Sequence, residues 1–196
     1  MFCVTNATNE PMLLTWGSAD GRWLETVRIR PFEGGLRATG HIVRAGGYGA
    51  SYSVIVGADG VVRRASVQTD AVNGERSLAL TRNPSGNWVS ESSTSSTPRL
   101  ELAEAKDVYL RGSAFTASLP IRRLGAYREI GTVSGVAADV HLPSLTIDAS
   151  VHQGVTTRVD DGGATIEYSG TFAAQTMTVD ADGFVLTFGD TIKRLT

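Results

Sequence analysis

Apolar and polar residues alternate with a period of two through most of this chain. The clearest runs cover residues 61–71, 145–152, 166–174 and 184–188. In the second run, Leu145, Ile147, Ala149 and Val151 alternate with polar residues that include Ser150 and His152. Because successive side chains of a strand point to opposite faces, this pattern predicts half-buried strands whose apolar side chains face the core.

Short turn signals separate these runs. Each contains Asp-Gly, Asn-Gly or Gly-Gly, which tolerate the positive φ of tight hairpin turns. They are Ala19–Gly21, Ala58–Gly60, Val72–Gly74, Asp161–Gly163 and Ala181–Gly183, and a further hairpin is predicted at residues 46–49. With 22 glycines in the chain, the pattern predicts an all-β fold, either a sandwich, a barrel or a rolled sheet.

Little helix is expected. The best candidate, Leu100–Lys106, is too short to be stable alone and also fits the lead-in to a strand. The low-complexity stretch 91–98 is interpreted as a solvated loop. The chain length of 196 residues fits a single domain covering residues 1–196, although two small domains would just fit.

Composition limits the molecules that this chain is expected to bind and the compartment in which it is expected to lie. Hydrophobic residues make up 41% of the chain, charged residues 19%, and the formal net charge is −2. This balance supplies no electrostatic drive toward nucleic acid. The single cysteine, Cys3, cannot form an internal disulfide. The N-terminus lacks the pattern of a signal peptide, and no stretch reaches about 18 apolar residues. A cytoplasmic location is the simplest expectation, and the oligomeric state stays open.

Sequence motifs for catalysis are missing. The chain contains no G-x-S-x-G elbow, no P-loop and no H-E-x-x-H zinc motif. The spacing between His141 and His152 is unusual for a metal site. These two histidines and His41 alternate onto polar strand faces, which predicts that they are solvated. We therefore predict no catalytic residue, no metal site and no cofactor.

Two segments carry a family resemblance. Residues 107–124 read DVYLRGSAFTASLPIRRL, and the C-terminal part contains Val-Asp-x-x-Gly-Phe-Val at 179–185 before a terminal Lys-Arg-Leu. Weaker matches are Trp16 with Glu25, Gly40, Tyr52-x-Val54, Asp59 and Trp88. In order and spacing, from Trp16 to Leu195, the sequence resembles a bacterial family named for glycolipid binding.

This resemblance implies a fold and a class of ligand. The fold would be the family's long rolled antiparallel sheet, a spiral β-roll, and the ligand a glycolipid or another lipid-like molecule. The chain departs from the family pattern where Ser113-Ala114 replaces Thr-Pro, Ala117 replaces Asn, Val155 replaces an aromatic residue and Phe188-Gly189 replaces Tyr-Pro. These changes would alter binding if relatives contact the ligand through the replaced groups.

Arg122 and Arg123 are the first candidates for a ligand site. In a strand, adjacent side chains face opposite sides, so one of the two is expected to point inward. An inward guanidinium suits an anionic headgroup at a cavity mouth. The alternative, which we favour, is a salt bridge to Glu25, Asp107 or Asp59, because buried arginine is rarely unpaired.

Hydroxyl and aromatic side chains complete the predicted site. Thr116 is expected to orient a polar headgroup. Glu25 is either part of the site or the ion-pair partner of an arginine on a neighbouring strand. The candidates for lining a sugar or lipid pocket are Trp16 and Tyr52, with Trp23, Trp88, Tyr109 and Tyr127. Core packing is the favoured interpretation for each of these rings taken singly.

Three functions fit these observations. The leading hypothesis is a binding protein for a glycolipid or similar amphipathic ligand, held in an apolar cavity of the curled sheet. The second is a structural or interaction module that pairs or dimerises through exposed sheet edges. The third is a hydrolase or isomerase in which Glu25, Asp59 and Arg122 converge in one pocket. The leading hypothesis requires a hollow, apolar interior.

Overall fold

The computed structural model describes residues 10–93, 102 and 104–196. The first seven strands follow one another in sequence: β1 (Met12–Ser18), β2 (Trp23–Phe32), β3 (Gly35–Arg44), β4 (Tyr48–Gly57), β5 (Val62–Ala71), β6 (Gly74–Arg82) and β7 (Trp88–Ser92). The remaining elements are β8 (Asp107–Leu110), the helix α1 (Ala114–Leu124), β9 (Gly131–Val140), β10 (Ile147–Asp160), β11 (Gly163–Ser169), β12 (Gln175–Asp180), β13 (Val185–Phe188) and β14 (Ile192–Arg194).

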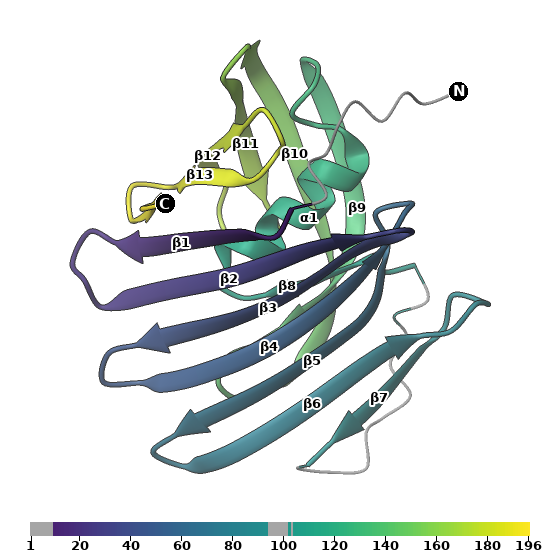
Figure 1. The fold of residues 1–196 in the computed structure, drawn as a ribbon, viewed down its shortest axis with the longest axis vertical. Helices are drawn as coiled ribbons and strands as arrows, with labels where there is room; N and C mark the ends of the chain where they lie inside the picture. Colours follow the sequence, from purple (N-terminus) through teal and green to yellow (C-terminus); the bar gives the residue numbers. More distant parts are fainter. Residues whose placement is uncertain (1–9, 94–101, 103) are drawn as a thin grey trace.

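All fourteen of these strands belong to one sheet. Their order is β7-β6-β5-β4-β3-β2-β1-β14-β13-β12-β11-β10-β9-β8, and only the pair β8–β9 is parallel. The strands β1–β7 form one wall, and the rest of the sheet curls behind it (Figure 1). The two edge strands, β7 and β8, stand at opposite ends of this order and do not pair with each other, so the roll stays open between them. The predicted all-β rolled sheet is confirmed.

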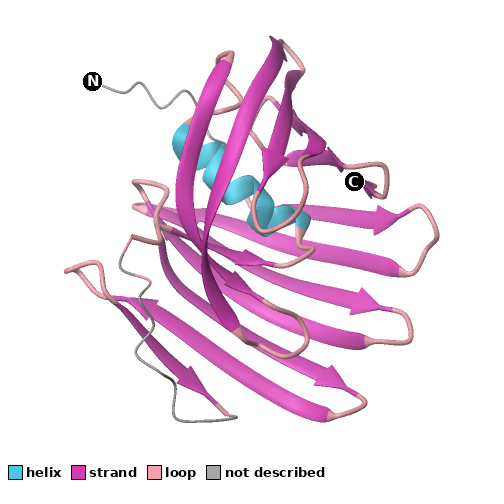
Figure 2. Cartoon of the chain, turned by 180° about the vertical axis from the view of Figure 1, so that it is seen from behind, coloured by secondary structure: helices cyan, strands magenta, loops and turns pink. Residues whose placement is uncertain are grey.

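The helix α1 occupies the inside of the roll. It lies between the long strands β9 and β10 and the wall formed by β1–β7 (Figure 2). Every residue from Ala114 to Ile121 is buried. The Phe115 ring lies between Tyr52 and Phe184, with ring centroids 6.3 and 6.5 Å away. Along the helix, the interior is therefore packed with side chains.

The interpretation of Arg122 and Arg123 as strand residues was wrong. The segment Ala114–Leu124 is helical, with the Ser113 hydroxyl accepting a hydrogen bond from the Thr116 N–H as N-cap. Gly125 ends the helix in the left-handed region at φ +70°. Arg122 and Arg123 therefore lie in the last turn of a helix. They do not face opposite sides of a strand, as was predicted.

The two faces of β10 are also the reverse of the prediction. Val151 is 64% exposed and Ala149 is exposed, whereas Ser150 and His152 are buried. The reason is that polar groups inside the roll bond to the inward side chains, as described below. The predicted solvated position is thus wrong for His152. His41 is exposed and His141 is half-buried.

The predicted turns are confirmed. Glycines with positive φ occupy all five hairpin signals, at Gly21, Gly60, Gly74, Gly163 and Gly183, and the segment 46–49 joins β3 to β4. Cys3 and most of the low-complexity stretch lie outside the described residues. So does part of the helix candidate 100–106, and its residues 104–106 are not helical. In the described part of the chain, no helix has the length and apolar character needed to cross a membrane.

Candidate functional site

One polar cluster surrounds Glu25 on the inner face of β2. The carboxylate is fully buried and accepts hydrogen bonds from the hydroxyls of Tyr52 (2.5 Å) and Ser113 (2.6 Å). It also accepts from the backbone N–H groups of Ala114 (2.7 Å) and Phe115 (3.3 Å). Glu25 thus caps α1 from a distant strand, where the helix dipole favours negative charge. Burial raises the pKa of the Glu25 carboxyl, and the four donors offset part of that rise.

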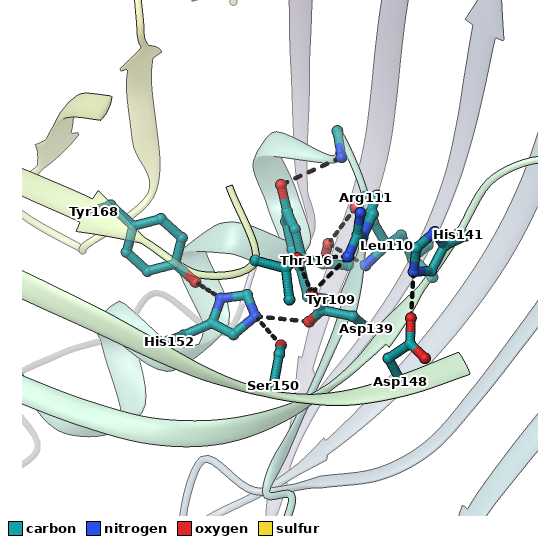
Figure 3. A network of polar contacts seen from close by, with 12 residues as sticks. Tyr109, Leu110, Arg111, Thr116, Asp139, His141, Asp148, Ser150, His152 and Tyr168 are labelled. Atoms are coloured by element: carbon teal, nitrogen blue, oxygen red, sulfur yellow. Dashed lines mark hydrogen bonds and ion pairs between the residues drawn. The ribbon is translucent and has the colours of Figure 1, made fainter. Parts of the chain in front are cut away.

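A second buried cluster centres on His152 of β10. Figure 3 shows the imidazole between Tyr168 on one side and Asp139 and Ser150 on the other. Its Nδ1 lies 2.7 Å from the Tyr168 hydroxyl, and its Nε2 lies 2.6 Å from Asp139 and 2.9 Å from Ser150. Thr171 donates a hydrogen bond to the other oxygen of Asp139 (3.1 Å).

The electrostatics of this cluster differ from those around Glu25. Burial alone would raise the pKa of Asp139, but the interactions with His152, together with hydrogen bonds from Ser150 and Thr171, outweigh it and lower that pKa. Burial raises the pKa of Tyr168 well above its usual value, and that of Tyr109 to about 12. Ser150 and Asp139 bind the same ring nitrogen, so the trio lacks the nucleophile–base–acid order of a catalytic triad.

The two arginines of the L-P-I-R-R-L segment are engaged inside the protein. Arg123 pairs with the buried Asp107, at 2.5 Å between Nη2 and Oδ2 and 3.1 Å between Nε and the same oxygen. The favoured salt bridge is therefore present, with Asp107 as the partner. Arg122 lies 4.0 Å from the centroid of the Phe184 ring and donates to the carbonyl of Asp182.

A continuous groove lies on the outer face of β3–β7. It has two lobes, of about 720 and 570 Å³, which share His41, Ser51, Gln68, Ser77 and Ser93. The larger lobe adds Thr39, Ser53, Ser66, Ala79 and Glu91, and the smaller adds Val43, Gly49, Asp70, Glu75 and Arg76. We call this feature the hydroxyl groove, because serine and threonine dominate its outward-facing lining.

Strand register produces the groove. Thr15, Thr26, His41, Ser51, Gln68 and Ser77 are successive partners across β1–β6 and form one row on the outer face. The next row contains Arg28, Thr39, Ser53, Ser66, Ala79 and Glu91. The side chains at the centres of both rows are small, and this leaves the volume of the groove unfilled. Within the described residues, the side chains of Thr39, Ser51, Ser53, Ser66 and Gln68 form no hydrogen bond to protein.

An apolar stripe adjoins the smaller lobe. Leu24 is 43% exposed, and it lies opposite Val43, which is 55% exposed and lines that lobe. On the other side Leu24 lies opposite Gly17. A Cβ atom at Gly17 would lie 3.1 Å from Leu195, which is 60% exposed. The stripe, defined as Leu24, Val43 and Leu195, therefore continues the groove across β3, β2 and β1.

Comparison with known proteins identifies the family. A family model described as "Putative glycolipid-binding" matches residues 13–194. The chain belongs to this family. It is also similar to the crystal structure of a DUF1089 family protein from Pseudomonas aeruginosa, with a TM-score of 0.63 and 20% sequence identity over 100% of this chain and 99% of that one. At that identity the likeness shows the fold. No curated protein matches the chain.

Four of the family's weaker sequence matches, Trp16, Glu25, Gly40 and Tyr52, meet at the Glu25 cluster, whereas Asp59 pairs with Arg63 and Trp88 donates to the Ala105 carbonyl. Trp16 lies opposite Glu25 in the β1–β2 register, and Gly40 lies opposite Tyr52 in β3–β4. A Cβ atom on Gly40 would lie 2.4 Å from the Tyr52 ring, so only glycine leaves room for that ring. Trp16 donates to the Val185 carbonyl (2.8 Å) of β13, which is two strands away in the sheet. In this chain, these residues hold α1 inside the sheet.

The departures from the family pattern lie at the start of α1, on β10 and on β13. Ser113 keeps the N-cap hydroxyl that Thr would supply. Ala114 supplies an N–H to Glu25 that Pro would lack. Ala117 and Phe188 are both buried, and Val155 is 36% exposed on β10. None of these residues lines the hydroxyl groove.

Most predicted site residues lie away from the groove. Glu25, Trp16 and Thr116 are buried, and Thr116 bonds to Leu110 in the β8–α1 connection. Tyr52 lies in a strand that floors the larger lobe, although its ring packs inward against Phe115. Ligand contact by these four and by Arg122 and Arg123 stays a prediction. Sequence reasoning missed the groove residues because their signal lies in the pairing of the five strands β3–β7.

Proposed function

We propose that this protein binds a glycolipid on the outer face of β1–β7. The sugar lies in the hydroxyl groove, and the acyl chain lies over the apolar stripe of Leu24, Val43 and Leu195. The observation that carries the proposal is the larger lobe of about 720 Å³, in which the side chains of five lining residues form no hydrogen bond to protein in the described part of the chain: Thr39, Ser51, Ser53, Ser66 and Gln68. Ligand sites commonly have volumes of roughly 300–1,000 Å³.

The chemistry of the groove suits a sugar. Each serine or threonine hydroxyl both donates and accepts, as do the hydroxyls of a hexose. Several such groups in register match a polyhydroxylated ring better than they match a hydrocarbon. The neighbouring apolar stripe suits a chain of methylene groups, because covering exposed apolar surface is favourable. Membership of the family supports the same class of ligand.

This proposal moves the ligand from the inside of the roll to its outside. The inside holds α1, and both lobes open on the outer face. The proposal also favours binding over catalysis. The carboxyls of Glu25 and Asp139, whose pKa values are shifted, lie among buried side chains and line neither lobe.

The test is titration of the ¹⁵N-labelled protein with octyl glucoside below its micelle-forming concentration, followed by NMR. We expect the largest shift changes at Thr39, Ser51, Ser53, Ser66 and Gln68. Ser66→Tyr fills the larger lobe and is expected to weaken binding at least tenfold. Ser134→Tyr is the matched control, since Ser134 is exposed on β9 outside the groove. Shift changes centred on α1, or equal binding by both variants, would overturn the proposal.

A further inference from the structure

Four arginines form a cluster on the outer face beside the hydroxyl groove. Arg30 on β2 lies directly opposite Arg37 on β3. Arg28 lies two residues along β2 on the same face, and Arg64 on β5 lies opposite Ile55, which in turn lies opposite Arg37. All four side chains are exposed. We call Arg28, Arg30, Arg37 and Arg64 the arginine cluster.

Within the part of the chain that the structure describes, the cluster forms no ion pair. Five other arginines, Arg63, Arg111, Arg123, Arg158 and Arg194, each lie within ion-pair distance of an aspartate. No ion pair or hydrogen bond joins the cluster's side chains to any other described residue. Like charges directly opposite each other in a sheet are destabilising. The net charge of the whole chain is −2, so this positive patch is local.

Strand register joins the cluster to the groove. Arg28 lies opposite Thr39, Thr39 lies opposite Ser53, and Ser53 lies opposite Ser66. The last three line the larger lobe. The far end of the groove carries Asp70 and Glu75, which are partners of each other, and Glu91 lies at the β7 side. Positive charge therefore lies beside the groove at β2 and β3, whereas Asp70, Glu75 and Glu91 line it near β5, β6 and β7 together with Arg76.

We propose that the glycolipid carries a phosphate, which the arginine cluster binds while the sugar occupies the hydroxyl groove. This inference rests on the proposed function, because the sugar places the phosphate beside Arg28 and Arg37. The planar guanidinium binds phosphate oxygens through two parallel hydrogen bonds. A bound phosphate also supplies the negative charge that Arg30 and Arg37 lack, which removes the cost of placing them opposite each other.

The experiment compares octyl glucoside with octyl glucoside 6-phosphate by isothermal titration at low salt. The phosphorylated glycoside is expected to bind at least tenfold more tightly, and the difference should shrink as salt is added. In the double variant Arg30→Gln/Arg37→Gln, that preference is expected to disappear while octyl glucoside binds as before. Arg158→Gln on β10, an exposed arginine outside the cluster, is the matched control and should leave both affinities unchanged.

Two further probes identify the source of the phosphate. Inorganic phosphate is expected to bind far more weakly than the phosphorylated glycoside, and equal binding would overturn the inference. Phosphatidylglycerol vesicles that bind when neither glycoside does would show a lipid-surface contact instead. If Ser66→Tyr weakens both glycosides but the arginine variant changes neither, the inference fails and the proposed function stands. If Ser66→Tyr changes neither, the proposed function fails.

Discussion

The inside and the outside of the roll use polar side chains in opposite ways. Inside, Glu25 accepts four hydrogen bonds, both ring nitrogens of His152 are bonded, and Asp107 is paired with Arg123. Outside, the arginine cluster and the groove side chains of Thr39, Ser51, Ser53, Ser66 and Gln68 have no such partners among the described residues. Polar groups inside stabilise the fold, whereas those outside remain available to a ligand.

Among the polar groups inside the roll, we expect Glu25→Ala to lower the free energy of unfolding the most. It removes the acceptor for two hydroxyls and two N–H groups that are all buried. Leaving buried partners of a charged group unpaired costs about 3–5 kcal/mol. We expect the free energy of unfolding, measured with urea, to fall by that amount.

Tyr52→Phe is the matched variant for Glu25, because it removes one of the four donors and keeps the ring. It is expected to cost about 1–2 kcal/mol. If Glu25→Ala were no more costly than Tyr52→Phe, the carboxylate would not be the group that holds α1 in the roll.

Asp139→Asn tests the His152 cluster through its pH dependence. The folded-state pKa of Asp139 lies below its ordinary value of 3.8, so its carboxylate adds stability above that pH. This contribution is lost as the pH falls through the folded-state pKa. We expect Asp139→Asn to be less stable at neutral pH by about 1–3 kcal/mol. The gap should narrow as the pH falls below the ordinary pKa of 3.8 and through the lower folded-state pKa.

Urea unfolding across this pH range measures the effect. Asp148→Asn is the control, since Asp148 pairs with His141 but is largely exposed. Its loss is expected to matter little at any pH. A gap for Asp139→Asn that stays constant with pH would mean that the cluster is held by packing and not by the charge of Asp139.

The sheet was predictable from the sequence, but the inner surface of β10 was not. Alternation identifies a strand, and it identifies the buried face only when the core is apolar. In β10 the core is polar, because Asp139 and Tyr168 come from neighbouring strands and bond to His152. The alternation within β10 does not reveal which polar side chains the neighbouring strands carry. It therefore predicted that the apolar Val151 points inward.

The helix α1 left a local signal that its strand-like residues concealed. Ser113 is a good N-cap, and Gly125 is a typical residue after a helix end. The family's Thr-Pro at positions 113–114 is likewise a helix start, because proline is favoured at the first helical position. Pro120 inside the segment argued against a helix. The groove and the arginine cluster depend on register between strands, which no local pattern encodes.

Arg37→Gln gives the smallest expected effect and has the opposite sign to the inner variants. Arg37 and Arg30 are like charges directly opposite each other, so removing one should raise the free energy of unfolding by about 0.2–1 kcal/mol at low salt. The gain should shrink as salt screens the repulsion. Arg158→Gln, which removes a paired arginine, should bring no gain. A loss of stability in Arg37→Gln would show that the cluster is bonded within the protein, and the contrast between the two faces would fail. A gain in stability together with weaker binding of the phosphorylated glycoside would mean that the cluster is kept for its ligand at the expense of the fold.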